Sequence, residues 1–480
     1  MSTGARRILA NTGYRLLADA GSKLASVAFY VIAARELGAE GFGVFTFGLA
    51  FVLLATTLGS FGQDSVLTRE VARDKKLLDR YFFNTLALKV VLCAGSLAIA
   101  IGAAVAFGID PETRNVLLLL GPAAAIELLM TTCFATFQAF ERMEFTPVAL
   151  ISQRTLTAAA GIAALLAGAG VVTVSAIYLV GSVFGFALAL WLLLRRVARP
   201  ALEVQPARWP ALMRAAAAIG LTSVFAVILF RVDMTMLAAF EPNDVVGDYG
   251  AAYRLLEATL FVSWSVSSAL YPVFSRLTPT SVPPVGFIFE RGVKLGTALT
   301  LPLAAGVLVL ADPLVETLYG DEYGRAATAL RLLAPAIALY PLCYVAGSLL
   351  VAQHRQRVML RIYAVVAAEN VLANLVLIPW LSLDGAALGT SISTTLVAVA
   401  LVVFTQRMAG GVDWRRVGTG PVVAALTAAG VMLVLRDTFP AAVVAGAVVY
   451  LGVLYSVERL LYPDDARTVL DLLKRRGATA

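Results

Sequence analysis

The sequence has few of the residues that catalysis at a metal ion or an activated nucleophile requires. Its single histidine, His354, lies in the polar stretch QHRQR at an expected helix end, where we predict a solvated surface residue. The three cysteines lie in separate apolar segments and are predicted to be small buried hydrophobic residues rather than a disulfide framework: Cys93, Cys133 and Cys343. The sequence has no phosphate-binding glycine loop, metal-ligand cluster or nucleophile elbow. It therefore predicts no catalytic set, no metal site and no cofactor.

Charge is also scarce. Only 14% of the 480 residues are charged and 60% are hydrophobic, which gives a mean hydropathy of +0.84. The core of a soluble domain could not absorb so much apolar surface. Weak alternation and the lack of strand-turn units of about ten residues argue against an outer-membrane barrel. Because the backbone must satisfy its own hydrogen bonds in lipid, we predict an all-α polytopic membrane protein.

Long apolar runs fill most of the chain. A spanning helix needs about 20 mostly apolar residues, and about fourteen such segments can be placed. The predicted spans are 11–34, 42–63, 81–107, 115–138, 146–168, 171–194, 212–240, 246–274, 287–310, 325–352, 359–380, 385–405, 417–435 and 441–461. The first has the lowest hydropathy, because it contains charged residues.

The connections between the spans form two sets of opposite charge. One set is rich in Arg and Lys: 64–80, 195–214, 353–361 and 406–416. The alternate set is acidic, as in GIDPE and EPNDVVGD. The positive-inside rule places the basic set in the cytoplasm. An even number of spans then puts both termini there too, in a multi-pass protein of the plasma membrane. The net charge of +7 is accordingly a topology signal and does not indicate nucleic-acid binding.

The spans divide into two halves. We predict an N-lobe at 1–195, a cytoplasmic linker at 196–211, a C-lobe at 212–407, and two accessory helices with a cytoplasmic tail at 408–480. A weak internal repeat supports the division, because EGFGVF around Gly43 resembles VVGDY around Gly247 at the equivalent turn of each half. Repeated halves around a central substrate site are typical of transporters.

Charged residues inside the first predicted span form a stripe. Arg15, Asp19 and Lys23 are spaced at i, i+4 and i+8, which places them on one helix face. Snorkelling with an internal salt bridge accounts well for Arg15 but poorly for Lys23, which lies deeper. We therefore expect the stripe to line a water-filled cavity.

A second charged group lies where the seventh and eighth predicted spans meet, in RVDMTMLAAFEPNDVVGDYGAAYRLLE. Matched depths along the two antiparallel spans predict crosswise pairs, Asp233 with Arg254 and Arg231 with Glu257. Two readings remain open for these pairs. They are either a lock between two helices, or a cavity site in which an arginine can leave its carboxylate for an anionic ligand.

Four further ionisable residues lie within predicted spans. Lys89 and Arg154 are near cytoplasmic ends, where long basic side chains are expected to snorkel. Glu127 and Glu369 lie deeper. They are candidates for coupling to H⁺ or Na⁺, and an interhelical hydrogen bond explains them equally well.

Several stretches resemble a known family and occur in its order. ARELGAEGFGVFTFGLAF with LGSFGQDSVLTREVAR, the charged hairpin above, ADPLVETLYGDEYGRAATALRLL and NLVLIPWLSLDGAALGTSIS extend over residues 11 to 405. They resemble the polysaccharide and oligosaccharide flippases of the multidrug/oligosaccharidyl-lipid/polysaccharide exporter superfamily. The resemblance implies two six-helix lobes around a central cavity, plus two accessory helices.

The resemblance also implies a function. Such proteins flip a polyprenyl-diphosphate-linked oligosaccharide from the cytoplasmic to the outer leaflet by alternating access, for cell-surface polysaccharide biosynthesis. Cationic residues of the cavity are thought to hold the diphosphate, and Arg15, Lys23, Arg231 and Arg254 match that role here. The implied partners are the lipid-linked oligosaccharide, the bilayer and a polysaccharide polymerase or other export machinery. A monomer is expected.

Two other functions fit less well. A cation-coupled multidrug exporter of the same superfamily would use an acidic, aromatic cavity and a coupling carboxylate, and the mixed charge of the predicted cavity leaves it open. A membrane-embedded polysaccharide polymerase or ligase would need a large outer loop carrying carboxylates or histidines. The outer connections here are short.

Overall fold

The computed structural model describes residues 3–277 and 284–463, and of residues 3–25 it describes the backbone alone. This part of the chain is helical and contains no strand. The α-helices are α1 (Thr3–Thr56), α2 (Gln63–Arg73), α3 (Leu78–Ala106), α4 (Pro111–Ala139), α5 (Phe145–Leu166), α6 (Val171–Leu192), α7 (Trp209–Phe240), α8 (Asn243–Phe274), α9 (Val285–Tyr319), α10 (Ala326–Ala352), α11 (Gln356–Leu381), α12 (Leu383–Ala409), α13 (Trp414–Val434) and α14 (Phe439–Leu461).

Most predicted spans coincide with one helix each. Twelve helices of the described residues are long and apolar enough to cross a membrane, which confirms the all-α polytopic prediction. α8 is not among the twelve, and its 32 residues include four charged ones: Asp244, Asp248, Arg254 and Glu257. Charges inside a membrane helix are costly, so a helix that keeps them is a candidate for function.

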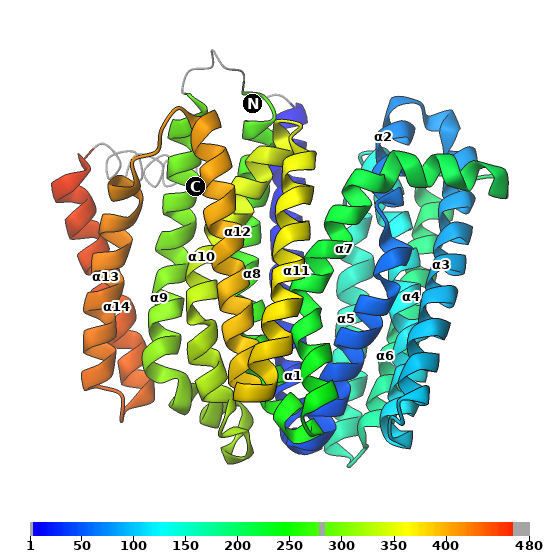
Figure 1. The fold of residues 1–480 in the computed structure, drawn as a ribbon. Helices are drawn as coiled ribbons and strands as arrows, with labels where there is room; N and C mark the ends of the chain where they lie inside the picture. Colours follow the sequence, from blue (N-terminus) through cyan, green and yellow to red (C-terminus); the bar gives the residue numbers. More distant parts are fainter. Residues whose placement is uncertain (1–2, 278–283, 464–480) are drawn as a thin grey trace. The chain divides into compact units, whose positions relative to one another are not determined.

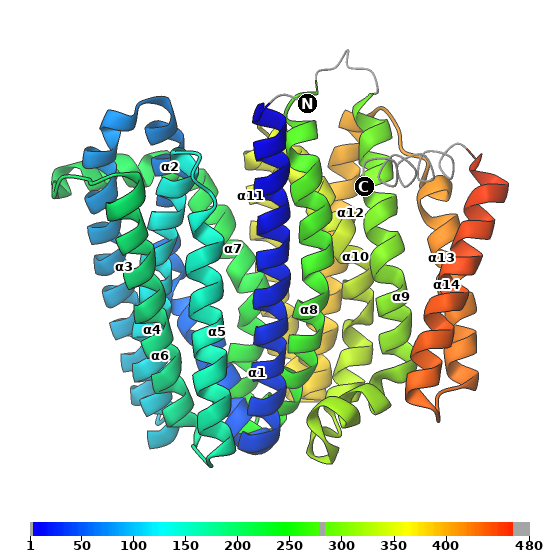
Figure 2. The same ribbon diagram turned by 180° about the vertical axis from the view of Figure 1, so that it is seen from behind.

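Helix α1 (Thr3–Thr56) contains the first predicted span and most of the second. Its backbone is non-helical at Gly38, where φ is 66° and ψ is 177°. Glycine adopts a positive φ at little cost because it has no Cβ. The chain reverses direction at this residue (Figures 1 and 2). One glycine thus replaces the loop expected between spans 11–34 and 42–63.

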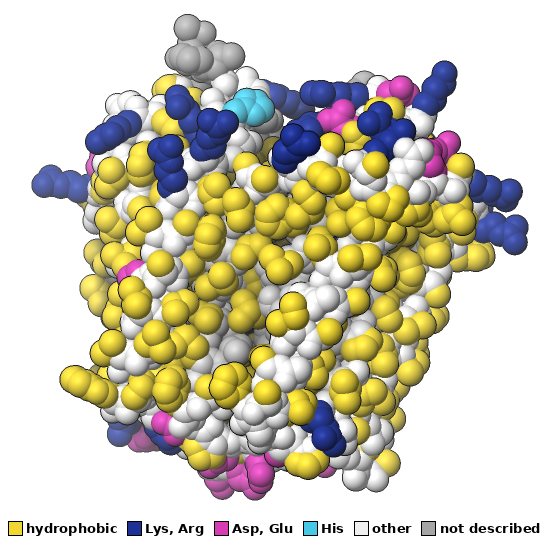
Figure 3. All heavy atoms as spheres, turned by 45° about the vertical axis from the view of Figure 1, so that its right-hand side comes forward, with side chains coloured by type: hydrophobic (Ala, Val, Ile, Leu, Met, Phe, Trp, Pro, Cys, Tyr) yellow, Lys and Arg dark blue, Asp and Glu magenta, His cyan; other side chains and the backbone are white. Residues whose placement is uncertain are grey.

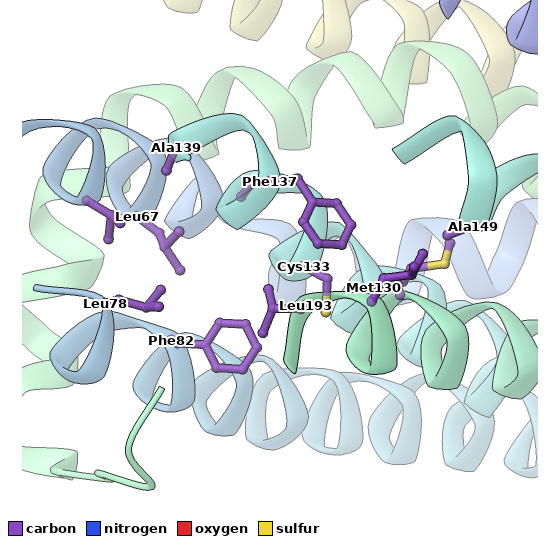
Figure 4. Close-up of a cluster of buried hydrophobic side chains, with 13 residues drawn as sticks. Leu67, Leu78, Phe82, Met130, Cys133, Phe137, Ala139, Ala149 and Leu193 are labelled. Atoms are coloured by element: carbon purple, nitrogen blue, oxygen red, sulfur yellow. The ribbon is translucent and has the colours of Figure 1, made fainter. Parts of the chain in front are cut away.

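The basic connection 64–80 is not a simple loop, because it contains α2. Val66, Leu67 and Val71 on one face of α2 are buried. Leu67 packs into a hydrophobic cluster with Phe82 of α3 and Phe137 of α4 (Figure 4). The helix starts after Gly62, whose φ is 80°. Sequence hydropathy missed α2 because its other face is polar.

The helices form two compact units. The first comprises residues 1–254 and 363–386, and the second comprises residues 255–362 and 387–480. In the first unit α4 packs against α6 and α3, and α1 packs against α5. In the second unit α9 packs against α10, α13 and α14. The lobe boundaries at residues 195, 212 and 408 stay a prediction.

The surface is divided by residue type. On the face shown in Figure 3, hydrophobic side chains cover the middle, most Lys and Arg side chains lie along one edge, and Asp and Glu side chains lie at both edges. Some of the exposed side chains are large and apolar; the relative solvent exposure of Trp380, for example, is 82%. Such a belt is what a bilayer requires of the protein it surrounds.

The two glycines of the sequence repeat lie at one helix crossing within the first unit. A Cβ on Gly43 of α1 would lie 1.8 Å from the Asn243 carbonyl oxygen and 3.0 Å from the Gly247 nitrogen. A Cβ on Gly247 of α8 would lie 2.0 Å from the Ala39 carbonyl oxygen. The segments that the repeat relates are therefore in direct backbone contact, which only glycine permits.

Candidate substrate and coupling sites

The acidic hairpin between α7 and α8 is held by two tyrosines. Asp233 is fully buried and accepts hydrogen bonds from the Tyr249 hydroxyl at 2.6 Å and the Met234 amide at 2.7 Å. One turn further along α8, the Tyr253 hydroxyl donates to the Phe230 carbonyl at 2.7 Å. The spacing of i and i+4 puts both tyrosines on the α7 side of α8. Neither tyrosine was a predicted site residue, because the prediction rested on the charged residues of this hairpin.

The arginines of the hairpin lie over aromatic rings. The Arg254 guanidinium carbon is 4.0 Å from the centre of the Tyr30 ring of α1, and that of Arg231 is 5.7 Å from the Tyr253 ring. Both arginines are partly exposed. A ring face attracts a cation without neutralising its charge. The two ring contacts therefore stabilise positive charge at this hairpin.

The structure describes the other predicted residues of this site only in part. Glu257 belongs to the second unit, whereas Arg231, Asp233 and Arg254 belong to the first. The crosswise pairs Asp233–Arg254 and Arg231–Glu257 stay a prediction. The side chains of Arg15, Asp19 and Lys23 lie outside the described part of the chain, and their backbone belongs to α1.

Glu127 lies in a polar cluster between α4, α5 and α6. Its Oε1 accepts hydrogen bonds from Gln153 Nε2 at 2.7 Å and Ser182 Oγ at 3.4 Å. Its Oε2 is 3.9 Å from the Arg154 guanidinium, which also donates to the Tyr178 hydroxyl at 3.2 Å. The expectation that Arg154 snorkels was wrong, because it turns towards these interior partners. The interhelical hydrogen bond expected as one explanation of Glu127 is present.

Glu369 lies on α11 and is partly buried. The next residue, Asn370, accepts a hydrogen bond of 3.1 Å from Asn374 one turn later, and both asparagines are fully buried. The two buried amide side chains form a hydrogen bond with each other that lipid could not supply. The coupling role of Glu369 stays a prediction.

Lys89 is at the centre of a polar cluster in the first unit. Its Nζ is 2.8 Å and 2.7 Å from the two carboxylate oxygens of Asp64, 2.7 Å from the Leu128 carbonyl, and 2.9 Å from the hydroxyls of Thr131 and Thr132. Both threonine hydroxyls also contact Asp64. The expectation that Lys89 snorkels was wrong. The side chain is 0% exposed, since its partners provide the solvation that water would otherwise supply.

Asp64 also lines a cavity of about 470 Å³ in the first unit. The cavity is bounded by residues of α2 and α4 and by the start of α5: Asp64, Ser65, Thr68, Arg69, Thr131, Phe134, Ala135, Gln138, Met143 and Thr146. None of these residues was a predicted site residue. The only sign of this cavity in the sequence was the periodic polar pattern of DSVLTR, and that segment was expected to be a loop.

The cysteines are where the sequence predicted them. Cys93, Cys133 and Cys343 are free and buried. Within the described residues, no group of three or more His, Cys, Asp or Glu side chains is placed to hold a metal ion.

Comparison with known proteins identifies the family. The family described as "Polysaccharide biosynthesis protein" matches residues 8–278, more than half of the chain. The chain belongs to this family. The related MatE family matches residues 218–376. Together the matched stretches include the hairpin of α7 and α8 and the Lys89 cluster.

The curated relatives of this chain include transport proteins. The chain is 23% identical to the succinoglycan biosynthesis transport protein ExoT of Rhizobium meliloti, over all of this chain and 98% of the relative. It is 24% identical to the probable low-salt glycan biosynthesis flippase Agl15 of Haloferax volcanii over 162 residues, and 28% identical to the probable flippase AglR over 178 residues. These two matches span 34% of Agl15 and 36% of AglR.

Solved structures share the fold of this family member. The lipid II flippase MurJ in an inward closed conformation matches 93% of this chain and 98% of its own, with a TM-score of 0.79 and 14% identity. An inward-facing multidrug resistance transporter of the MATE family matches 81% of this chain and 94% of its own, with a TM-score of 0.64 and 17% identity. At such identities the likeness concerns the fold alone.

Proposed function

We propose that this protein is a flippase that moves a polyprenyl-diphosphate-linked oligosaccharide from the cytoplasmic to the outer leaflet of the plasma membrane. The observation that carries the proposal is the match to the transport protein ExoT, which extends over the whole of both chains. The partial matches to two proteins named as flippases and the shared fold with MurJ support it.

The physical task explains the parts of the molecule. A sugar head with a diphosphate cannot cross hydrocarbon unaided, because its polar groups would lose their hydrogen bonds. A wet cavity with a few cations holds the head while the lipid tail stays in the bilayer. Alternating access then moves the head across without covalent chemistry.

The diphosphate is assigned to the basic residues of the predicted cavity: Arg15, Lys23, Arg231 and Arg254. A planar guanidinium binds two phosphate oxygens at once. The positions of Arg254 over Tyr30 and Arg231 over Tyr253 support this assignment, because both place a guanidinium charge at the hairpin of α7 and α8. Asp19, Asp233 and Glu257 complete the proposed cavity lining.

Coupling and topology complete the proposal. Glu127 and Glu369 are the candidate sites for a coupling cation. The basic connections and both termini face the cytoplasm, in keeping with the edge of Lys and Arg side chains in Figure 3. The protein acts as a monomer and delivers its substrate to a polysaccharide polymerase or other export machinery.

A second function is favoured by one observation. The MatE family match over residues 218–376 is consistent with a cation-coupled exporter of amphipathic drugs. Deletion of the gene distinguishes the two. We expect loss of a surface polysaccharide with unchanged drug sensitivity. Increased drug sensitivity with normal surface polysaccharide would instead support the exporter.

A further inference from the structure

We propose that the cavity between α2 and α4 is a docking site for the uncharged sugar portion of the glycan, separate from the arginines assigned to the diphosphate. The inference rests on the flippase function proposed above. It assigns a substrate part to residues that the charged cavity does not include.

Two helix faces build the site. Asp64, Ser65, Thr68 and Arg69 are spaced at i, i+1, i+4 and i+5 and form one face of α2. On α4 the cavity-lining residues are spaced at i, i+3, i+4 and i+7: Thr131, Phe134, Ala135 and Gln138. Other residues of both helices, such as Leu67 of α2 and Phe137 of α4, are buried in the hydrophobic cluster of Figure 4. The lining residues are therefore held on a rigid support.

The charges of the site cancel in pairs. The Nζ of Lys89 lies 2.7 Å from a carboxylate oxygen of Asp64, and two threonine hydroxyls also donate to this carboxylate. The Nε of Arg69 donates to Glu70 at 2.9 Å. A cationic drug would need a carboxylate without such a partner, and a diphosphate would need several unpaired cations. The balance favours a ligand without net charge.

The remaining polar groups of the cavity can form hydrogen bonds with sugar hydroxyls. Thr68 Oγ1 gives its proton to the Ala135 carbonyl at 3.2 Å, so it offers acceptor lone pairs to the cavity. Ser65 and Gln138 are exposed at its wall, and Phe134 supplies an apolar face. Small-molecule sites of about 300–1,000 Å³ combine apolar surface with a few fixed polar groups. A volume of about 470 Å³ is suitable for a mono- or disaccharide.

The position fits the direction of transport. The cavity is lined by α2, the helix within the Arg- and Lys-rich connection 64–80. Under the proposed topology it opens on the cytoplasmic side, where the substrate is loaded. A sugar bound there would be held before its diphosphate reaches the arginines of the hairpin.

Site-directed labelling of the purified full-length protein tests the inference. The native cysteines are buried, so Ser65→Cys introduces a thiol that a polar maleimide reaches selectively. A panel of neutral disaccharides (cellobiose, lactose and N,N′-diacetylchitobiose) is the probe. We expect at least one of them to slow labelling of Ser65→Cys and to leave labelling of the exposed control Ser275→Cys unchanged.

Two variants test whether the protection depends on polar groups of the cavity. Thr68→Val and Gln138→Leu each remove a polar group that can hydrogen-bond a sugar hydroxyl. We expect each to weaken the disaccharide's protection of Ser65→Cys by roughly fivefold. The matched control Thr427→Val, on an exposed position of α13, should have no effect. If no disaccharide protects, or if protection survives both variants, the assignment is wrong.

Flipping of a lipid-linked oligosaccharide is measured separately with the same variants. If the lipid-linked oligosaccharide is flipped but no disaccharide protects Ser65→Cys from labelling, the sugar site is wrong and the flippase function stands. Protection that depends on Thr68 and Gln138, without flipping, would overturn the flippase function and keep the sugar site.

Discussion

Gly43 and Gly247 lie in backbone contact where α1 crosses the start of α8. A Cβ at Gly43 would lie 1.8 Å from the Asn243 carbonyl oxygen, and one at Gly247 would lie 2.0 Å from the Ala39 carbonyl oxygen. Backbone atoms cannot move aside as a flexible side chain can. The two glycines that the sequence repeat relates thus lie where two helices of the first unit meet backbone to backbone.

Substitution of either glycine should therefore destabilise the protein. We expect Gly43→Ala and Gly247→Ala each to cost about 3 kcal/mol, because overpacking forces the helices apart. The melting temperature in detergent measures the effect. Gly102→Ala in α3 is the matched control, since nothing lies within 4 Å of its added Cβ. Unchanged melting of both crossing variants would refute the contact.

Lys89 and Asp64 should depend on each other for stability. Lys89→Met leaves the partly buried Asp64 carboxylate without its cation and is expected to cost roughly 3 kcal/mol. The double variant Asp64→Asn with Lys89→Met should recover a large part of that loss. A double-mutant cycle on thermal unfolding checks this. Additive losses would show that the pair is not coupled.

Arg254 should contribute to substrate binding through its guanidinium as well as its charge. Arg254→Ala is expected to lower flipping about tenfold, and Arg254→Lys should restore only part of it, because lysine lacks the planar fork. Tyr30→Phe keeps the ring below Arg254 and is the control. Full activity of Arg254→Ala and of Arg231→Ala would rule out the anion site.

Glu127 should couple transport to a cation gradient if it exchanges a proton. Glu127→Gln keeps an oxygen acceptor for the Gln153 amide but cannot ionise. We expect its transport to lose the dependence on a pH gradient while its melting temperature stays near that of the native protein. Glu369→Gln, measured in parallel, distinguishes the two carboxylates. Unaltered gradient dependence in both variants would exclude them as coupling sites.

The sequence predicted the helices better than it predicted the polar clusters. Hydropathy found the spans because each needs a long apolar run, and it found both arms of α1 on either side of Gly38. It missed α2, since only Val66, Leu67 and Val71 on one face of that short helix are buried. Burial of a face is a property of the packed protein.

The polar clusters depend on partners distant in the sequence. Lys89 was expected to snorkel because it lies near a helix end. Its carboxylate partner Asp64 is 25 residues earlier in a segment that was expected to be a loop, and the two threonines come from α4. Spacing within one helix can be read from a sequence. The approach of three helices to one point cannot.

Flipping in proteoliposomes tests the central claim most directly. The purified protein is reconstituted with a fluorescent polyprenyl-diphosphate oligosaccharide, and accessibility of the glycan to an added glycosidase reports its leaflet. We predict that glycan initially protected inside becomes accessible with the native protein, and about tenfold more slowly when both Arg231 and Arg254 are replaced by alanine. Equal accessibility with native protein and empty vesicles would contradict the account, above all if the same vesicles transport a cationic drug.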